Sequence, residues 1–270
     1  MKPAAFDFVR PGSLDEALTI LARADGAARP IAGGQSLGPM LNLRLARPGL
    51  LVDISRLPEL LAVEDRRESW LVGAATTHAV LEDGATAVGT GMVSEVARGI
   101  AYRAVRNRGT IGGSLAHADS AADWPLALTA MGATAHVAGV TGMRRVPVSS
   151  LIRGMFETVL DDAELIIAVE IPKGSAAMRW GYYKFCRKIG EFPDASAAVV
   201  LDPDRGWAAA AIGAVSGPPR LLPDVSELLR ARSSPDGLSD AVGAAAPELD
   251  DLGRHLHARA LNRAFTQACG

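Results

Sequence analysis

Apolar residues recur at helical spacing near the start of the chain, within residues 13–26. The apolar stripe consists of Leu14, Ala17, Leu18 and Leu21. Ser13 stands directly before the stripe and Glu16 follows three residues later, which is the spacing of a capping box. Gly26 comes after the stripe and is typical of a helix end. The pattern predicts a capped amphipathic helix in this segment.

Helical and extended patterns alternate from there up to Pro172. Strands are predicted over residues 28–34, 50–55, 69–76 and 163–172. Helices are predicted over residues 77–83, 92–105 and 122–131. Thr77 is the expected cap of the first of these helices, and Gly132 the expected stop of the last, with a strand after it. Such interleaving predicts an α+β or α/β fold.

The pattern changes after a candidate domain boundary near residues 172–178. Three strands are predicted over residues 181–189, 195–202 and 206–217, joined by turns rich in Gly, Pro and Asp. Helices are predicted over residues 224–233, 237–246 and 252–268. Tyr182 and Tyr183 are neighbours on the first strand, so they are expected on its opposite faces. This predicts a second unit made of three strands followed by helices.

Charge and hydropathy exclude some classes of function. The formal net charge is −2, so the chain has no basic excess with which to neutralise nucleic-acid phosphates. No apolar run approaches the roughly 18 residues of a membrane span. The first residues contain Asp7 and two prolines and lack the continuous apolar stretch of a signal peptide. A cytoplasmic protein is expected.

The cysteines and histidines of the sequence give no candidate ligands for a metal centre on this chain. Cys186 and Cys269 are too few for a disulfide framework or an iron–sulfur cluster, and Cys186 is expected to be a core thiol. The five histidines show no metal-ligand spacing. His255 and His257 are predicted to be surface residues that point in different directions from a helix. No metal site is predicted here.

Two glycine-rich segments carry the candidate chemistry: "IAGGQSLGP" at residues 31–39 and "GTIGGSLAHAD" at residues 109–119. Because glycine lacks Cβ, successive backbone N–H groups can approach an anion closely, and Ser hydroxyls add donors. Neither segment matches GxGxxG or GxxxxGK[ST], so neither a Rossmann nor a P-loop assignment is supported. Taken alone, the spacing also fits two ordinary turns.

Over a longer stretch of sequence, these segments resemble those of a known family. "AGGQSLGPMLNLRLARP" and "RNRGTIGGSLAHADSAADWP" resemble the two FAD-binding signatures of the xanthine dehydrogenase, or molybdenum hydroxylase, family. More narrowly, they are similar to its flavin-carrying medium subunits of the carbon monoxide dehydrogenase type. The resemblance continues in "FETVLDDAELIIAVEIP", "RWGYYKFCRKIGEFPDASAAVVL" and "HLHARALNRAF", and so spans essentially the full chain.

This resemblance implies a particular α+β architecture. Residues 1–174 would form a two-part FAD-binding domain of two α/β subdomains. Residues 175–270 would form a smaller C-terminal α+β domain with a three-stranded antiparallel sheet and helices.

The resemblance also implies which residues contact FAD. The pyrophosphate would lie against Ala32, Gly33, Gly34, Gln35 and Ser36, with Leu37 beside it. A second wall would be formed by Thr110, Ile111, Gly112, Gly113 and Ser114. The remaining contacts would come from Ile100 and Ala101 at the adenine end, His117 in a polar loop, Asp123 at the FAD hydroxyls, Ile166 at the flavin ring, and Lys184. Asp119 is expected to be a solvated turn residue rather than a ligand.

Two positions depart from the family pattern, and some side chains have a second interpretation. Many relatives have His where this chain has Gln35, which still offers an amide donor. Many have Asp-Tyr where this chain has Glu191 and Phe192; the phenylalanine keeps an aromatic face for the flavin but lacks the hydroxyl. Lys184 could instead be an exposed strand residue. Three arginines could form a functional basic patch near phosphate or make salt bridges at a subunit contact: Arg103, Arg106 and Arg108.

The function implied by the resemblance is electron transfer. A large partner subunit would oxidise the substrate at molybdopterin, and a small partner would carry two [2Fe–2S] clusters. Electrons would pass through FAD on this chain to an external acceptor, usually within a dimer of heterotrimers. No catalytic acid or base is assigned to this chain. A stand-alone FAD-dependent reductase or oxidase, and a scaffold that has lost FAD, are the alternatives.

Overall fold

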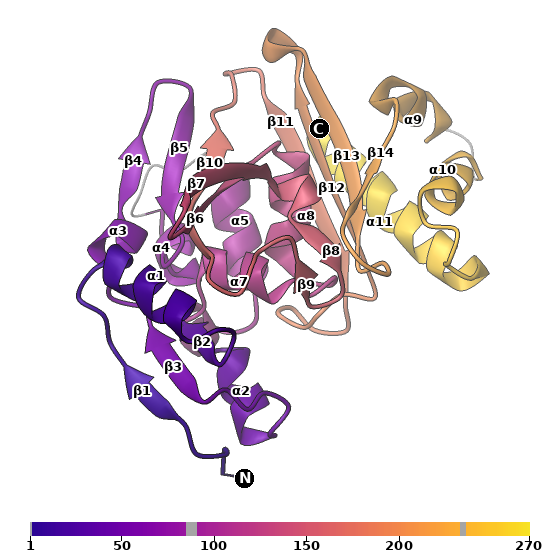
Figure 1. The fold of residues 1–270 in the computed structure, drawn as a ribbon. Helices are drawn as coiled ribbons and strands as arrows, with labels where there is room; N and C mark the ends of the chain where they lie inside the picture. Colours follow the sequence, from indigo (N-terminus) through magenta and orange to yellow (C-terminus); the bar gives the residue numbers. More distant parts are fainter. Residues whose placement is uncertain (1, 85–90, 233–235) are drawn as a thin grey trace.

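The computed structural model describes residues 2–84, 91–232 and 236–270 (Figure 1). Figure 1 shows the N-terminal elements in indigo at one end of the molecule and the C-terminal elements in yellow at the other. Within the described residues, the main strands form one parallel and two antiparallel sheets, with helices packed against them. This arrangement confirms the expected α+β class.

The N-terminal sheet is parallel and has the strand order β1-β3-β2. Its strands are β1 (Asp7–Val9), β2 (Ala28–Ile31) and β3 (Leu50–Asp53). The predicted first helix is confirmed as α1 (Leu14–Arg23), in which the Ser13 hydroxyl accepts from the Glu16 N–H at 3.2 Å. The Glu16 carboxylate accepts from the Gly12 N–H, at 2.6 Å. In the predicted apolar stripe, Ala17, Leu18 and Leu21 are buried and Leu14 is half-buried.

The central sheet is antiparallel, in the order β4-β5-β10-β6-β7. Its strands are β4 (Val63–Asp65), β5 (Ser69–Gly73), β6 (Thr134–Gly139), β7 (Gly142–Pro147) and β10 (Leu165–Pro172). The helices of this part are α2 (Leu37–Asn42), α3 (Pro58–Leu61), α4 (His78–Glu82), α5 (Met92–Gly99), α6 (Arg103–Arg106), α7 (Ile111–His117) and α8 (Asp123–Ala130). A small hairpin joins β8 (Ile152–Gly154) to β9 (Glu157–Thr158).

Two predictions in this part are wrong. The single helix expected over residues 92–105 is broken into α5 and α6, because Ala101 adopts a left-handed backbone conformation with φ +42°. The polar loop expected at His117 is not found there, because the second glycine-rich segment is helical. It forms the first turns of α7, where the Thr110 hydroxyl caps the helix by accepting from the Gly113 N–H. His117 is therefore the last residue of a helix.

The C-terminal sheet has four strands rather than the three expected, in the order β11-β12-β13-β14. They are β11 (Arg179–Phe185), β12 (Ala195–Asp202), β13 (Trp207–Gly213) and β14 (Arg220–Leu222). The fourth strand is only three residues long, which is too short to show an alternating pattern. The helices are α9 (Val225–Ala231), α10 (Gly237–Ala245) and α11 (Asp251–Cys269). The predicted end of the first of them at Ser233 lies outside the described residues.

Strand β12 is buried on both faces. Ala198 and Val200 lie in the core beneath the central sheet, while Ala197 and Val199 lie in the C-terminal core with α11. Small residues suit this strand because helices pack on both of its sides, α8 on one and α11 on the other. The central core thus continues past residues 172–178, where the domain boundary stays a prediction.

Three side-chain predictions in the C-terminal part have clear outcomes. Tyr182 packs against the central core and Tyr183 against the C-terminal core, which confirms that they face opposite sides. His257 is not a surface residue: it is buried, and its ring nitrogens bond to the carbonyls of Gly253 and Gly213. Cys186 lies beyond the end of β11 and is only half-buried, so it is not a core thiol.

Candidate functional site

The first glycine-rich segment offers an uninterrupted run of unpaired backbone donors. Within the described part of the chain, the N–H groups of residues 33–37 donate to no protein acceptor. Gly34 has φ +70°, and a left-handed residue turns neighbouring N–H groups towards a common concavity that suits an anion. Gln35 and Ser36 are exposed. The segment therefore fits a negatively charged group such as a diphosphate.

The second glycine-rich segment is closed by its own bonds. The N–H groups of Ile111 and Gly112 donate to the carbonyls of Thr76 and Ala74, at 3.1 and 2.9 Å. The next two N–H groups, of Gly113 and Ser114, donate to Thr110. A Cβ added to Gly112 would lie 2.4 Å from the Ala74 Cβ. Gly112 is therefore needed for close packing, and free backbone donors support the expected anion-binding role only in the first segment.

The two segments nevertheless touch. A Cβ added to Gly33 would lie 1.9 Å from the backbone carbonyl oxygen of Arg108, so only glycine allows this approach. Arg108 itself has an exposed side chain. The first predicted wall thus meets the backbone of Arg108 and Gly109, directly before the second predicted wall at residues 110–114.

A buried histidine, His78, is hydrogen-bonded to the start of the second segment. Its backbone N–H donates to the Gly109 carbonyl at 2.9 Å, and Trp124 Nε1 donates to the ring Nδ1 of His78 at 3.0 Å. Burial lowers the pKa of His78 to about 4, and the charge of Arg106 contributes to this. His78 is therefore neutral at neutral pH, with its proton on Nε2.

Asp123 lies in a buried polar cluster that joins the central part to β11. The Tyr182 hydroxyl and Lys184 Nζ both donate to Asp123 Oδ1, at 2.7 and 3.0 Å. Lys184 Nζ also donates to the Gly99 carbonyl at 2.8 Å. Burial raises the pKa of Asp123, although Lys184 and Tyr182 act against the rise. Burial also raises the pKa of Tyr182 well above its usual range, so its hydroxyl is protonated and donates.

The positions of Asp123 and Lys184 bear on two predictions. Lys184 is not an exposed strand residue, because its side chain is 10% exposed. Asp123 is buried, as expected of a side chain that contacts FAD away from water. One of its carboxylate oxygens, however, already accepts from two protein donors. Its contact with FAD hydroxyls stays a prediction.

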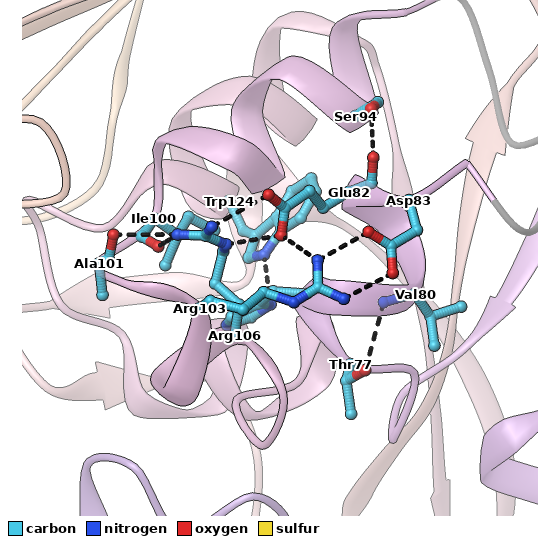
Figure 2. A network of polar contacts seen from close by, with 11 residues as sticks. Thr77, Val80, Glu82, Asp83, Ser94, Ile100, Ala101, Arg103, Arg106 and Trp124 are labelled. Atoms are coloured by element: carbon cyan, nitrogen blue, oxygen red, sulfur yellow. Dashed lines mark hydrogen bonds and ion pairs between the residues drawn. The ribbon is translucent and has the colours of Figure 1, made fainter.

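The adenine-end residues predicted from the resemblance lie in the turn between α5 and α6. Arg106 Nη1 donates to the carbonyls of Ile100 and Ala101, at 2.9 and 3.0 Å. Figure 2 shows this arginine and Arg103 together with the α4 carboxylates that they bind. Glu82 accepts from both arginines, so Arg103 and Arg106 form salt bridges within the chain and are not a free basic patch.

The remaining predicted residues are more scattered. Ile166 is buried in the central core beside a β-bulge of β10. The His117 ring lies 4.9 Å from that of Phe156, and burial lowers the pKa of His117. Phe192 is 66% exposed, on a loop that forms a β-bridge between Gly190 and Ile100. Asp119 is half-buried and accepts from the Ala121 N–H, as a turn residue does.

The sequence did not point to several residues that support the site, namely Gly99, Glu82, His78, Trp124 and Gly190. Tyr182 is two residues from Lys184 on one strand, so strand periodicity already placed both on one face. Glu82 and Arg106 are separated by 24 positions, and no local pattern signals their pairing. Across the described residues, no group of three or more His, Cys, Asp or Glu side chains could hold a metal ion, and no helix is long and apolar enough to cross a membrane.

Comparisons with known proteins point to one family. Residues 4–174 match the model of the FAD binding domain in molybdopterin dehydrogenase. The nicotine 6-hydroxylase medium subunit of Paenarthrobacter nicotinovorans is 35% identical over 254 residues, which are 92% of this chain and 89% of that subunit. The carbon monoxide dehydrogenase medium chain of Hydrogenophaga pseudoflava is 34% identical over 202 residues, 74% of this chain and 70% of the relative.

Solved structures agree over almost the whole length of the chain. Quinoline 2-oxidoreductase from Pseudomonas putida 86 has a chain that matches with a TM-score of 0.87 and 32% identity, covering 99% of this chain and 98% of that one. Carbon monoxide dehydrogenase from Hydrogenophaga pseudoflava has one that matches with a TM-score of 0.88 and 29% identity, covering 100% and 99%. The chain therefore belongs to the FAD-binding medium subunits of the molybdenum hydroxylases, a family of oxidoreductases.

Proposed function

We propose that this chain is the electron-transfer subunit of a molybdenum hydroxylase complex and passes electrons from iron–sulfur clusters of a partner through FAD to an external acceptor. The observation that supports the proposal most directly is the run of unpaired N–H groups at residues 33–37. Such a run lies in a chain whose family binds FAD, a cofactor with a diphosphate at its centre. The corresponding N–H groups of residues 111–114 are already paired within the protein.

The chain's own residues would bind and orient the cofactor. Backbone donors of residues 32–36 would hold the diphosphate, with Leu37 beside it. The cofactor would be flanked on other sides by residues 110–114 and 100–101, and the exposed ring of Phe192 would cover the flavin. His117, Asp123, Ile166 and Lys184 complete the proposed contacts. Bound FAD supplies the capacity to accept a hydride or single electrons, and no acid or base from this chain is required.

The proposed partners follow from the relatives. Several are named medium subunits or medium chains, and one related structure is described as lacking a Mo-pyranopterin moiety of the molybdenum cofactor. We propose a small subunit with two [2Fe–2S] clusters and a large molybdopterin subunit, assembled with this chain as a dimer of heterotrimers. Substrate oxidation would then take place on the large subunit.

The first test is the absorption spectrum of the purified chain, with the released cofactor identified and quantified. We expect FAD in a one-to-one ratio, and a Gly34→Ala variant that retains much less. Gly38→Ala is the matched control, because a Cβ at Gly38 meets no atom within 4 Å. A wild-type chain that stays colourless after incubation with FAD would contradict the proposal.

The electron-transfer role needs a second measurement on the complex purified with its partners. Reduction by substrate should bleach the flavin band and produce the electron paramagnetic resonance signal of reduced [2Fe–2S] clusters. If the isolated, FAD-loaded chain oxidises a reductant with oxygen in the absence of an iron-containing partner, a stand-alone reductase or oxidase is favoured instead. A chain that assembles with the partners without FAD would favour the scaffold.

A further inference from the structure

The turn between α5 and α6 directs three successive backbone carbonyls towards cations. The carbonyl of Gly99 accepts from Lys184, and those of Ile100 and Ala101 both accept from Arg106. The last carbonyls of a helix lack partners within the helix, and cationic side chains are favourable there. Here two different parts of the chain supply those cations, β11 and α6.

Arg106 is the cation that is held most firmly. Its side chain is 11% exposed and Glu82 is 12% exposed, and the two form a bidentate pair with distances of 2.7 and 3.0 Å. Arg106 lowers the pKa of Glu82, so the carboxylate stays ionised at neutral pH. One guanidinium group therefore joins α4 to both carbonyls of the turn, as Figure 2 shows.

Arg103 provides an internal comparison. It also donates to Glu82, at 2.7 Å, but its other hydrogen bonds go to Asp83 and not to the carbonyls of the turn. Arg103 and Asp83 are each about half exposed. The two arginines share a carboxylate, and they differ in whether they contact residues 100–101.

The turn is conformationally unfavourable by itself. Ala101 has φ +42°, a left-handed conformation that is unfavourable for a residue other than glycine. Its carbonyl is also approached by Gly190, where an added Cβ would lie 2.3 Å from the Ala101 oxygen. A β-bridge between Ile100 and Gly190 joins the turn to the loop that carries Phe192. Whatever fixes residues 100–101 therefore also fixes this loop.

We propose that Arg106, anchored by Glu82, is a positioning residue for FAD. It holds residues 100–101 and, through Gly190, the Phe192 loop in the arrangement that receives the cofactor. This inference rests on the proposed function, because the role of these two segments in FAD binding does. Arg106 itself does not touch the cofactor, since its donors are directed to Glu82 and the two carbonyls.

The test compares Arg106→Gln with Arg103→Gln in the full chain. Glu82 keeps one arginine partner in either variant. Hydrogen exchange of the FAD-free proteins reports the turn directly: amides of residues 100–102 and 189–191 should exchange about tenfold faster in Arg106→Gln than in Arg103→Gln. A fluorescence titration should show FAD binding weakened about tenfold or more in Arg106→Gln and little changed in Arg103→Gln. The visible spectrum of bound flavin should change only in Arg106→Gln.

Arg106→Lys separates positioning from charge. Lysine keeps the positive charge but cannot reach Glu82 and both carbonyls with one planar fork, so FAD affinity should recover only in part. The proposal is overturned if wild type binds FAD and both glutamine variants bind it equally well, or if exchange in the turn is unchanged. If wild type binds no FAD, the proposed function fails and the FAD-positioning role fails with it, while hydrogen exchange still shows whether Arg106 holds the turn.

Discussion

Residues 32–36 and residues 110–114 contain similar sets of small residues, and their backbones are used differently. In the first segment, Gly34 has a left-handed conformation and the N–H groups from Gly33 onwards have no protein acceptor among the described residues. In the second, the N–H groups of Ile111, Gly112, Gly113 and Ser114 all have one. The difference teaches that a glycine pair indicates close backbone approach, either to a ligand or to another part of the protein.

This comparison changes which substitutions test the site. In the first segment, glycine to alanine should affect the cofactor more than the fold. In the second, it should affect the fold first, and any loss of FAD would follow from that. Gly33 is a poor probe of either kind, because an added Cβ would collide with the Arg108 carbonyl whether or not FAD is bound.

The largest effect is expected from Gly112→Ala. The new Cβ would lie 2.4 Å from the Ala74 Cβ and 2.8 Å from the Ala74 carbonyl, so α7 must shift away from the end of β5. We expect the free energy of unfolding of the FAD-free chain to fall by about 3 kcal/mol, as measured by denaturant titration. Gly113→Ala is the control: its Cβ meets only the capping Thr110 hydroxyl, at 2.7 Å, so about 1 kcal/mol is expected. Equal losses in both variants would contradict a packing role for Gly112.

The next effect is a pH dependence of stability that arises from His78, which is hydrogen-bonded to Gly109 at the start of the second segment. Its pKa is about 4 in the folded chain against 6.5 ordinarily, so the unfolded chain binds a proton at a higher pH than the folded chain. The stabilisation is complete above pH 6.5 and is lost as the pH falls towards 4, by about 3 kcal/mol. His78→Asn keeps an acceptor for Trp124 without titrating, so its stability should depend less on pH over this range. Parallel curves for wild type and variant would contradict the assignment.

These two segments also show how much of the structure could be predicted from the sequence. Local signals were sufficient for α1 and α4, because each begins with a hydroxyl that caps its own helix, Ser13 and Thr77. Short apolar runs bounded by turns rich in Gly, Pro and Asp were sufficient for β12 and β13. The helix of the second glycine-rich segment was missed, and His117 was expected in a polar loop, because the capping role of Thr110 was not recognised. The acceptors that close it, Thr76 and Ala74, are more than 30 positions away and leave no local pattern.

The candidate site shows the same division. The resemblance to the family pointed to the two glycine segments, Asp123 and Lys184. It did not point to supporting residues such as Gly99 and Gly190. The break after α5 depends on Arg106, Lys184 and Gly190, which meet only in the folded chain. A helix was the better local expectation for residues 92–105, and tertiary contacts overrode it.

A smaller effect on stability, and a larger one on FAD, is expected from Gly34→Ala. At φ +70° an alanine costs about 1–2 kcal/mol, while its Cβ would meet Ile31 at an ordinary 3.4 Å. The FAD-free chain should therefore remain folded and bind FAD about tenfold more weakly, because the donor run must shift. Gly38→Ala has neither strain nor contact and should leave FAD affinity unchanged, with a gain of up to about 1 kcal/mol in α2. Full FAD retention by Gly34→Ala would show that this segment does not bind the diphosphate.

The smallest effect distinguishes Ser36, a serine expected to bind FAD, from Ser13, a serine that stabilises the fold. Ser36 precedes α2 but its hydroxyl makes no capping bond, and its side chain is exposed. Ser36→Ala should leave the free energy of unfolding within about 0.5 kcal/mol of wild type. If the hydroxyl donates to the diphosphate, FAD binding should weaken by about 1 kcal/mol. Ser13→Ala should do the reverse, because that hydroxyl caps α1: about 1 kcal/mol of stability is lost while FAD affinity stays the same. Stability and FAD titrations on both variants decide the matter, since a Ser36→Ala chain that loses stability but not FAD would place this serine with the fold and leave the backbone alone to bind the anion.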